Sequence, residues 1–302
     1  ILDSEDQYRV IKRVSKSMGL DDTKWPPRQI QWFINKQKDE CRRSKDVETS
    51  DDYFAEKMNE VYRAYEELCE RESLVDFGEL LLRTYLLLKS NKGVLDHYQK
   101  RFRHILVDEF QDTNEVQYQF LRLLCESDSH IMSVGDDDQS IYGWRGAKSE
   151  NINRFTKDYK NTEIIRLEQN YRSTSVILGA ANSVIKNNQG RMGKELWTDQ
   201  KEGEPISIYS AYNEDDEARY VVGSIQNWME QGRDLSEVAI LYRSNAQSRA
   251  LEEAILREGL AYRIYGGLRF YERAEIKNAM SYLRLVFGRE DDAAFERVIN
   301  IP

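Results

Sequence analysis

Apolar residues recur at intervals of three and four through the first hundred positions, the spacing that places them on one face of an α-helix. The first run follows Ser4 and Gln7, which have the spacing of a capping box, and it stops at Gly19. Its apolar members are Val10, Ile11, Val14 and Met18. We therefore expect a first helix with Ser4 as its N-cap.

Two further helices are expected in this region. Pro26-Pro27 opens the second, because proline suits the first turn of a helix, and Ser50 caps the third. The third helix carries an apolar stripe formed by Phe54, Met58, Val61, Tyr65 and Leu68. Such a stripe is ordinarily the face of a helix that packs into a small core.

The pattern changes after residue 102, where short β-branched runs alternate with helical stretches. Asn114 caps the helix after the first run, and Ser173 or Thr174 caps the helix after the third. The expected strands cover 105–107, 131–134, 164–167, 206–209, 238–242 and 262–265. Later helices are expected near 218–229, 248–258 and 272–287. This alternation is typical of parallel-sheet α/β domains.

The composition is that of a charged globular protein. Lys and Arg number 44 against 53 Asp and Glu, which gives a formal net charge of −9. No apolar run approaches the ~18–20 residues of a membrane span, and no secretory signal opens the chain. The three cysteines include no CxxC pair, which fits a cytoplasmic protein. An acidic chain that binds DNA must use local patches.

One basic patch lies between Lys24 and Lys45, where seven Lys or Arg residues meet only two acidic ones. A solvated helix surface is one interpretation of this run. A surface that contacts nucleic-acid phosphates is the other, and the sequence leaves both open.

Two expected strands end in carboxylates, Asp108-Glu109 and Asp136 to Asp138. Ligands bind at the carboxyl ends of strands in open α/β sheets. The first acid of such a pair can hold Mg²⁺, and the second can act as general base toward water. The alternative is that these acids simply cap the helices that follow.

Three blocks occur in order: ILVDEFQDT at 105–113, VGDDDQSIYGWRGA at 134–147 and LEQNYRST at 167–174. The combination resembles motifs II, III and IV of superfamily 1 DNA helicases of the UvrD/PcrA/Rep group. LVDF at 74–77 and YGGLRFYER at 265–273 resemble that group too. The resemblance covers the whole chain. It implies an α/β, P-loop NTPase fold with two incomplete RecA-like parallel-sheet motor domains and an N-terminal helical insertion domain.

The resemblance assigns ATP and Mg²⁺ as cofactors and gives each motif residue a role. Asp108 would hold Mg²⁺, Glu109 would activate water, and Gln139 would sense the γ-phosphate. Arg172 would be an arginine finger that stabilises charge on the transferred phosphoryl group. Tyr171 would stack on adenine; ordinary half-buried packing is its alternative.

The same resemblance implies contacts to DNA. Trp144 and Tyr142 would be platforms for bases, which stack on aromatic faces whatever their sequence. Arg145 would serve either phosphate or DNA, and the residues do not decide between them. Arg243 and Asn245 would touch the single-strand backbone, with a plain surface turn as their alternative.

The phosphate-binding sequence Gly-x-x-x-x-Gly-Lys-[Ser/Thr] is missing from the chain. The nearest approach, 190–195, has the wrong spacing. With Ile1 and Pro302 as its ends, we expect the chain to be an internal fragment. The implied parts are a helical insertion subdomain (1–102), a first motor part (103–168), a second motor part (169–265) and the start of another helical subdomain (266–302).

The function implied by the resemblance is an ATP-dependent 3′–5′ DNA helicase and translocase in DNA repair or replication. Its partners would be single-stranded DNA, single/double-strand junctions and DNA repair proteins, with no membrane. The fragment alone is expected to be inactive. The alternative is a non-catalytic fragment that binds single-stranded DNA or a protein partner.

Overall fold

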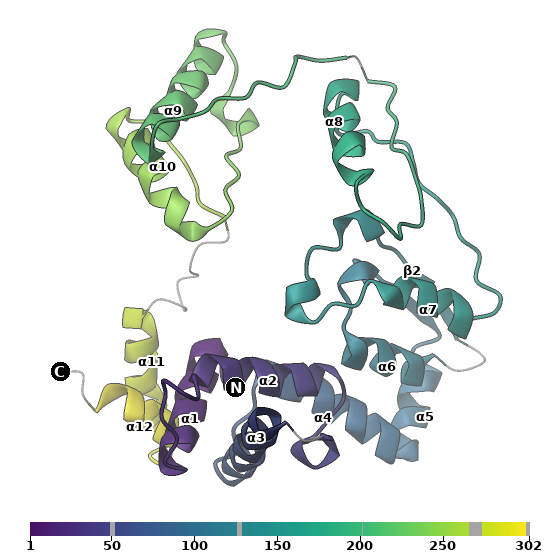
Figure 1. Cartoon of the computed structure of the whole chain (residues 1–302), viewed down its shortest axis with the longest axis vertical. Coiled ribbons are helices and arrows are strands. Elements are labelled where there is room, and N and C mark those ends of the chain that lie inside the picture. Colours follow the sequence, from purple (N-terminus) through teal and green to yellow (C-terminus); the bar gives the residue numbers. More distant parts are fainter. Residues whose placement is uncertain (49–51, 126–128, 201, 266–273, 300–302) are drawn as a thin grey trace. The chain divides into compact units, whose positions relative to one another are not determined.

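The computed structural model describes the chain except for residues 49–51, 126–128, 201, 266–273 and 300–302 (Figure 1). The chain divides into two compact units, 1–202 and 203–302. The helices of the first unit are α1 (Ser4–Ser17), α2 (Pro27–Asp39), α3 (Tyr53–Arg71), α4 (Phe77–Ser90), α5 (Lys92–Arg101), α6 (Glu115–Leu124), α7 (Glu150–Asp158) and α8 (Ser175–Ile185). Its strands are β1 (His104–Val107) and β2 (His130–Ser133).

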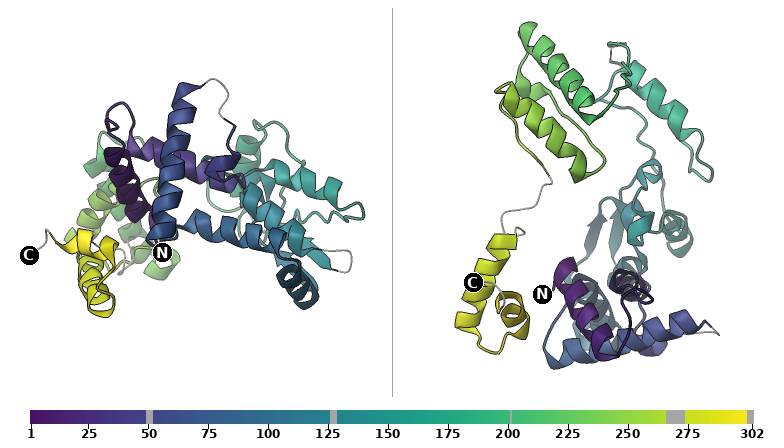
Figure 2. Two further views of the ribbon diagram at one scale, coloured as in Figure 1. Left: turned by 90° about the horizontal axis from the view of Figure 1, so that it is seen from below. Right: turned by 60° about the vertical axis from the view of Figure 1, so that its left-hand side comes forward.

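The first three helices pack against one another, as Figures 1 and 2 show. They bury one apolar cluster, which confirms the expected small core. Its innermost side chains are Ile11, Ile34, Val61, Tyr62 and Tyr65. Of the α3 stripe, Phe54 is exposed and lies beside the ring of Trp25, with ring centroids 4.9 Å apart.

The predicted caps of α1 and α3 are displaced. Asp3, not Ser4, caps α1, because its carboxylate accepts the amides of Glu5 and Asp6 at 2.9 and 2.8 Å. The capping-box prediction was therefore wrong. Asp52 caps α3, whereas Ser50 lies outside the described residues. The prediction that Asn114 caps α6 is confirmed by a reciprocal bond with Gln117.

The two expected strands at 105–107 and 131–134 form a parallel pair. His104 pairs with His130 and Val107 with Ser133, so both strands end at the same edge. Phe110, just beyond β1, donates its amide to the carbonyl of Val134 at 3.0 Å. Residues that follow β1 and β2 are therefore held next to each other.

The strands expected at 164–167, 206–209, 238–242 and 262–265 are absent from the described structure, and this prediction was wrong. A strand is stabilised by a ladder of hydrogen bonds to a neighbour, and these segments have none. Leu167, Ile208 and Leu241 are 80%, 93% and 94% exposed. Local β-propensity alone does not make a strand.

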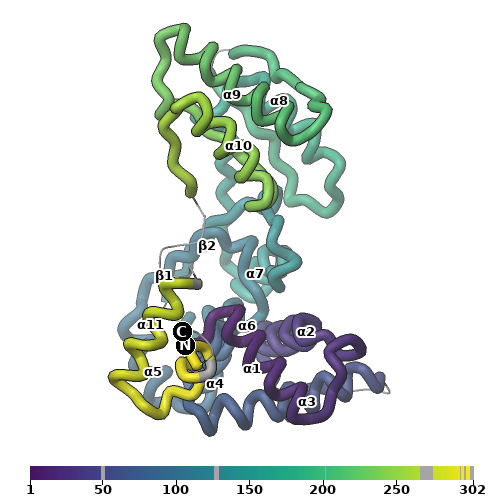
Figure 3. Tube along the Cα trace, turned by 90° about the vertical axis from the view of Figure 1, so that its left-hand side faces the viewer, coloured from purple at the N-terminus to yellow at the C-terminus, as the bar shows by residue number. Residues whose placement is uncertain are grey.

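The second unit is helical in its described residues. Its helices are α9 (Glu214–Glu230), α10 (Asn245–Arg257), α11 (Ala274–Phe287) and α12 (Asp292–Val298). Figure 3 shows α9 beside α10, and α11 packs on α12. The YGGLRFYER block lies, apart from Tyr265, outside the described residues. Across the described part of the chain, no helix is both long and apolar enough to cross a membrane.

Candidate functional site

The carboxylates Asp108 and Glu109 follow β1 directly, and both are exposed. Glu109 has a left-handed backbone, with φ 50° and ψ 42°, which is strained for a residue with a Cβ. Its amide donates to Asp108 Oδ1 at 2.9 Å. Strain of this kind persists only where the surrounding structure holds it, and it concentrates at functional sites.

The chemistry of Asp108 fits a magnesium ion. Mg²⁺ prefers one or two carboxylates and keeps several waters, so an exposed carboxylate at a strand end suits it. Among the described residues, only the Glu109 amide bonds to the Asp108 carboxylate. The chain has no phosphate-loop sequence, so it does not supply the residues that would cradle the ATP phosphates.

The second carboxylate block follows β2. Gln139 is exposed and makes two hydrogen bonds to Asp136. Its backbone N–H donates to the Asp136 carbonyl at 3.0 Å, and its side-chain Nε2 donates to the Asp136 carboxylate at 2.8 Å. Asp136, Asp137 and Asp138 bring their carboxylates within 4.8 Å of one another. This cluster therefore sits where the sequence placed it, beside the end of β1.

A loop around residue 192 neutralises that cluster. Arg191 makes two 2.6 Å bonds to Asp138, Lys194 pairs with Asp136, and the Met192 amide donates to Asp137 at 2.8 Å. Burial alone would raise the pKa of Asp136, but the Lys194 and Gln139 bonds lower it. Protein cations therefore already engage the carboxylates of Asp136 and Asp138, unlike that of Asp108. In the sequence, this loop is only an incomplete match to a phosphate loop.

An aromatic turn follows Gln139. Trp144 is 65% exposed, which agrees with the expectation that it lies outside the core, and Tyr142 is half-buried. The guanidinium of Arg145 lies over both rings, 4.7 Å from the Tyr142 centroid and 4.6 Å from the Trp144 centroid. Gly146 closes the turn with φ 88°. The three side chains form one cationic, stackable surface.

Contacts to Asp39 at the end of α2 and to Thr113 in the 105–113 block hold the aromatic turn in place. The sequence did not reveal these contacts. A Cβ on Gly146 would lie 2.9 Å from Asp39 Oδ2. Asp39 accepts from Asn114 at 2.7 Å, and the Lys148 amide donates to the Thr113 carbonyl at 2.9 Å. Burial, with Glu40 and then Asp76 adding to it, raises the pKa of Asp39 to about 6. Thr113 belongs to the 105–113 block but had no role assigned, and Asp39 gave no signal in the sequence, because each contact joins residues distant along the chain.

The third block is less enclosed. Tyr171 is 75% exposed, so the alternative of half-buried packing does not hold, and its hydroxyl donates to Gln169 at 2.8 Å. Arg172 is exposed, and its amide donates to Asn170 at 2.9 Å. No bond in the described residues joins Tyr171 or Arg172 to the carboxylate blocks.

Arg243 and Asn245 belong to the second unit. Both are exposed, and Asn245 is the first residue of α10. The Arg243 amide donates to Gln247 at 2.9 Å, within the box that caps this helix. Their side chains are therefore accessible, as either expected role requires.

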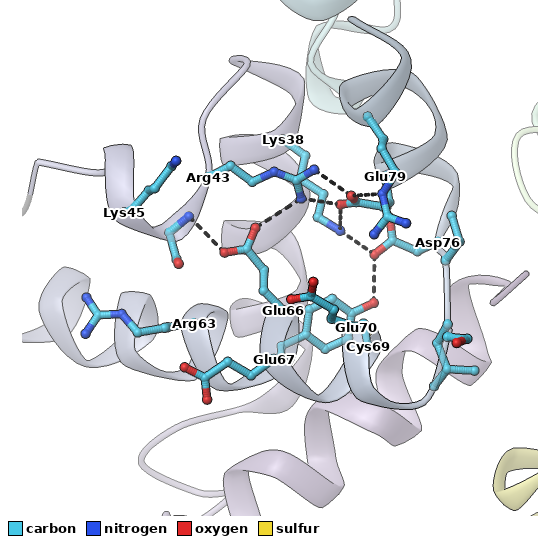
Figure 4. A pocket seen from close by; sticks show the side chains of 16 residues that line it. Lys38, Arg43, Lys45, Arg63, Glu66, Glu67, Cys69, Glu70, Asp76 and Glu79 are labelled. Atoms are coloured by element: carbon cyan, nitrogen blue, oxygen red, sulfur yellow. Dashed lines mark hydrogen bonds and ion pairs between the residues drawn. The ribbon is translucent and has the colours of Figure 1, made fainter. Parts of the chain in front are cut away.

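The basic run on α2 separates into two groups. The side chains of Lys38 and Arg43 point inward, as Figure 4 shows. Lys38 Nζ lies 2.7 Å from the Asp76 carboxylate and 3.1 Å from the Glu79 carboxylate. Arg43 holds Glu79 through two bonds of 2.7 and 2.6 Å. The exposed members are Lys24, Arg28, Lys36, Arg42 and Lys45. The run is therefore part core and part surface, which neither expectation foresaw.

A hollow beside α3 and α4 is lined by this charge cluster (Figure 4). Its other charged lining residues include Arg63, Glu66, Glu67 and Glu70. Lys38 is 2% exposed, and Tyr65 donates to Asp76 at 2.7 Å. The hollow contains none of the predicted site residues, and its innermost charges are paired with one another, so we regard the cluster as structural.

Comparison with known proteins matches residues 1–160 to the UvrD/REP helicase N-terminal domain and residues 165–302 to the UvrD-like helicase C-terminal domain. The chain is 59% identical to DNA helicase II of Escherichia coli, over its whole length and 42% of that relative. It is 55% identical to DNA helicase II of Haemophilus influenzae and 45% identical to the ATP-dependent DNA helicase PcrA of Bacillus subtilis. It spans about two fifths of the length of each relative.

Proposed function

Because the chain belongs to the UvrD/REP helicase family, we propose that it is the central part of an ATP-dependent 3′–5′ DNA helicase. The observation that carries this proposal is the joining of two features at one sheet edge. Exposed carboxylates follow β1, and the Gln139 to Gly146 segment with its aromatic surface follows β2. Nucleotide chemistry and strand binding would then share one rigid support.

Each role follows from the position of a side chain. Asp108 would hold Mg²⁺, which would neutralise phosphate charge when bound. Glu109 would take a proton from the attacking water. Gln139 would contact the γ-phosphate. Arg172 would stabilise the charge that develops on the transferred phosphoryl group, and Tyr171 would stack on adenine.

The aromatic turn would bind single-stranded DNA without sequence preference. Bases would stack on Trp144 and Tyr142, and Arg145, already held over both rings, would add positive charge toward the backbone. Arg243 and Asn245 would contact the strand from the second motor part. The proposed partners are single-stranded DNA, single/double-strand junctions and DNA repair proteins.

The proposed architecture assigns 1–102 to a helical insertion, 103–168 and 169–265 to parts of two RecA-like motors, and 266–302 to a second helical subdomain. This 302-residue chain by itself is expected not to hydrolyse ATP, since it lacks the phosphate loop.

The deciding experiment measures ATP hydrolysis by the full-length protein, with and without a single-stranded oligonucleotide at low salt. We expect DNA to stimulate turnover and Glu109→Gln to lower kcat by about 10²–10⁴-fold while nucleotide still binds. Normal turnover by Glu109→Gln would overturn the general-base assignment. The absence of DNA stimulation in the unmodified protein would overturn the helicase proposal.

A further inference from the structure

Gln111 is a buried amide between the two carboxylate blocks. It lies in the short turn after β1 (Phe110–Asp112) and is 1% exposed. Its Nε2 donates to Glu109 Oε2 at 2.6 Å, and its Oε1 accepts the Asp136 amide at 2.9 Å. Both ends of one side chain are therefore used, one toward each block.

Packing fixes the position of this amide. A Cβ at Gly135 would lie 2.7 Å from Gln111 Oε1 and 3.3 Å from the Phe110 nitrogen, so a side chain here would displace the Gln111 amide and crowd the Phe110 backbone. The Phe110 amide donates to the Val134 carbonyl just beside it, at 3.0 Å. Gln111 is thus held between the strand ends with little freedom to change rotamer.

The Gln111 amide makes both bonds because it carries a donor and an acceptor. An ionised carboxylate accepts and cannot donate, while a backbone N–H donates and cannot accept. The side chain between Glu109 and Asp136 therefore supplies a donor toward Glu109 and an acceptor toward Asp136. Glutamate at this position would keep the acceptor but set a second negative charge against Glu109, and methionine would supply neither group.

Glu109 otherwise has an exposed carboxylate on a strained residue. The bond from Gln111 holds one of its oxygens and leaves the other for water. On the opposite side, Gln111 bonds to the backbone of Asp136, to which Gln139 is tied through two bonds. A continuous chain of contacts thus runs from Glu109 through Gln111 and Asp136 to Gln139.

We propose that Gln111 is a positioning residue that orients the Glu109 carboxylate and couples it to the Asp136–Gln139 turn. This inference rests on the proposed function and deepens it. Movement of Gln139 on nucleotide or DNA binding would shift the Asp136 backbone and, through one buried amide, the group that activates water. Outer groups that orient a reacting side chain are commonly worth 10–100-fold in activity.

The test compares Gln111→Met and Gln111→Glu with Gln119→Met in the full-length protein. Gln119 is the control, because its one side-chain bond within the described part of the chain goes to Glu115, on the same helix, at 2.8 Å. We expect kcat to fall at least tenfold in both Gln111 variants, with KM for ATP and affinity for single-stranded DNA within about twofold. Gln119→Met should retain full activity. Gln111→Glu keeps the acceptor for Asp136 should Gln111→Met fail to fold.

A double-mutant cycle with Gln139→Ala tests the coupling. Residues in one hydrogen-bond network have non-additive effects, so the double variant should be no slower than the slower single variant. Three results would overturn the inference. They are a double variant whose loss in kcat is the product of the two single losses, an unchanged kcat in Gln111→Glu, and a loss of kcat that merely follows a loss of thermal stability. The absence of DNA-stimulated ATP hydrolysis in the unmodified protein would instead refute the proposed function, so the two failures are distinguishable.

Discussion

Carboxylates differ in burial and pairing between the helical region of residues 1–101 and the sheet region that follows it. In the helical region, Asp76 and Glu79 are about 4% exposed and fully engaged by Lys38 and Arg43. In the sheet region, Asp108 and Glu109 are exposed and sparsely bonded. Removing the partner of a buried, paired acid is costly to the fold, whereas an acid left accessible at a strained turn is available for chemistry.

Lys38→Met should have the largest effect on stability. It leaves Asp76 and Glu79 buried with one cation fewer, and breaking a buried pair typically costs about 3–5 kcal/mol. Lys36→Met, on the exposed face of the same helix, should stay within about 0.5 kcal/mol. Urea unfolding of both variants, followed by circular dichroism, measures this difference. Equal losses would erase the contrast between the regions.

Asp108→Asn should show the reverse behaviour. The side chain is exposed and has one described hydrogen bond, so the free energy of unfolding should change by less than about 0.5 kcal/mol. ATP hydrolysis by the full-length protein should nevertheless be lost, because the proposed magnesium ligand is weakened. Activity without loss, or a stability loss as large as that of Lys38→Met, would contradict the comparison.

Trp144→Ala should weaken single-stranded DNA binding by about 1–3 kcal/mol without affecting stability, because the ring is exposed and stacks on bases. Trp32→Ala is a matched control, since Trp32 is 60% exposed and also lies near a cation, Lys36. Fluorescence anisotropy with a labelled oligonucleotide measures the affinities. Similar losses in both variants would mean that no special platform exists at Trp144.

The acid dependence of stability should come from the helical region. Burial would raise the pKa of Glu79, but Arg43 and Lys38 lower it from 4.5 to about 2. The ionised group therefore stabilises the fold above pH 4.5, and this contribution is lost as the pH falls toward 2. Unfolding measured at about pH 5 and pH 3 should show a shallower decline in Glu79→Gln than in the unmodified chain.

The smallest effect is expected at Asp39, which joins the two regions. Its pKa is raised from 3.8 to about 6, so the fold favours its neutral form and loses stability as the pH rises through that value. Asp39→Asn keeps an oxygen for Asn114 and should unfold at a slightly higher temperature at pH 8. No gain should appear below about pH 3.8. Destabilisation at pH 8 would show that its charge is needed.

Helices and the motif blocks were predictable, because both are recorded in local sequence. The period of Val10 to Met18 and the cap at Asn114 involve neighbours only. The prediction of strands at 206–209 and 238–242 failed, since a strand depends on a partner that local sequence does not specify. Buried polar residues such as Lys38 and Gln111 look like surface residues in a sequence, and only the fold reveals their partners.

The unpaired apolar segments also bear on how the chain behaves in concentrated solution. Ile208 and Leu241 are exposed apolar side chains in segments without a strand partner, and such segments can associate with another molecule. The net charge of −9 opposes such encounters at neutral pH, and added salt or a pH near 5.2 removes that repulsion. Purification of this chain should therefore succeed best in dilute, low-salt buffer well above its isoelectric point.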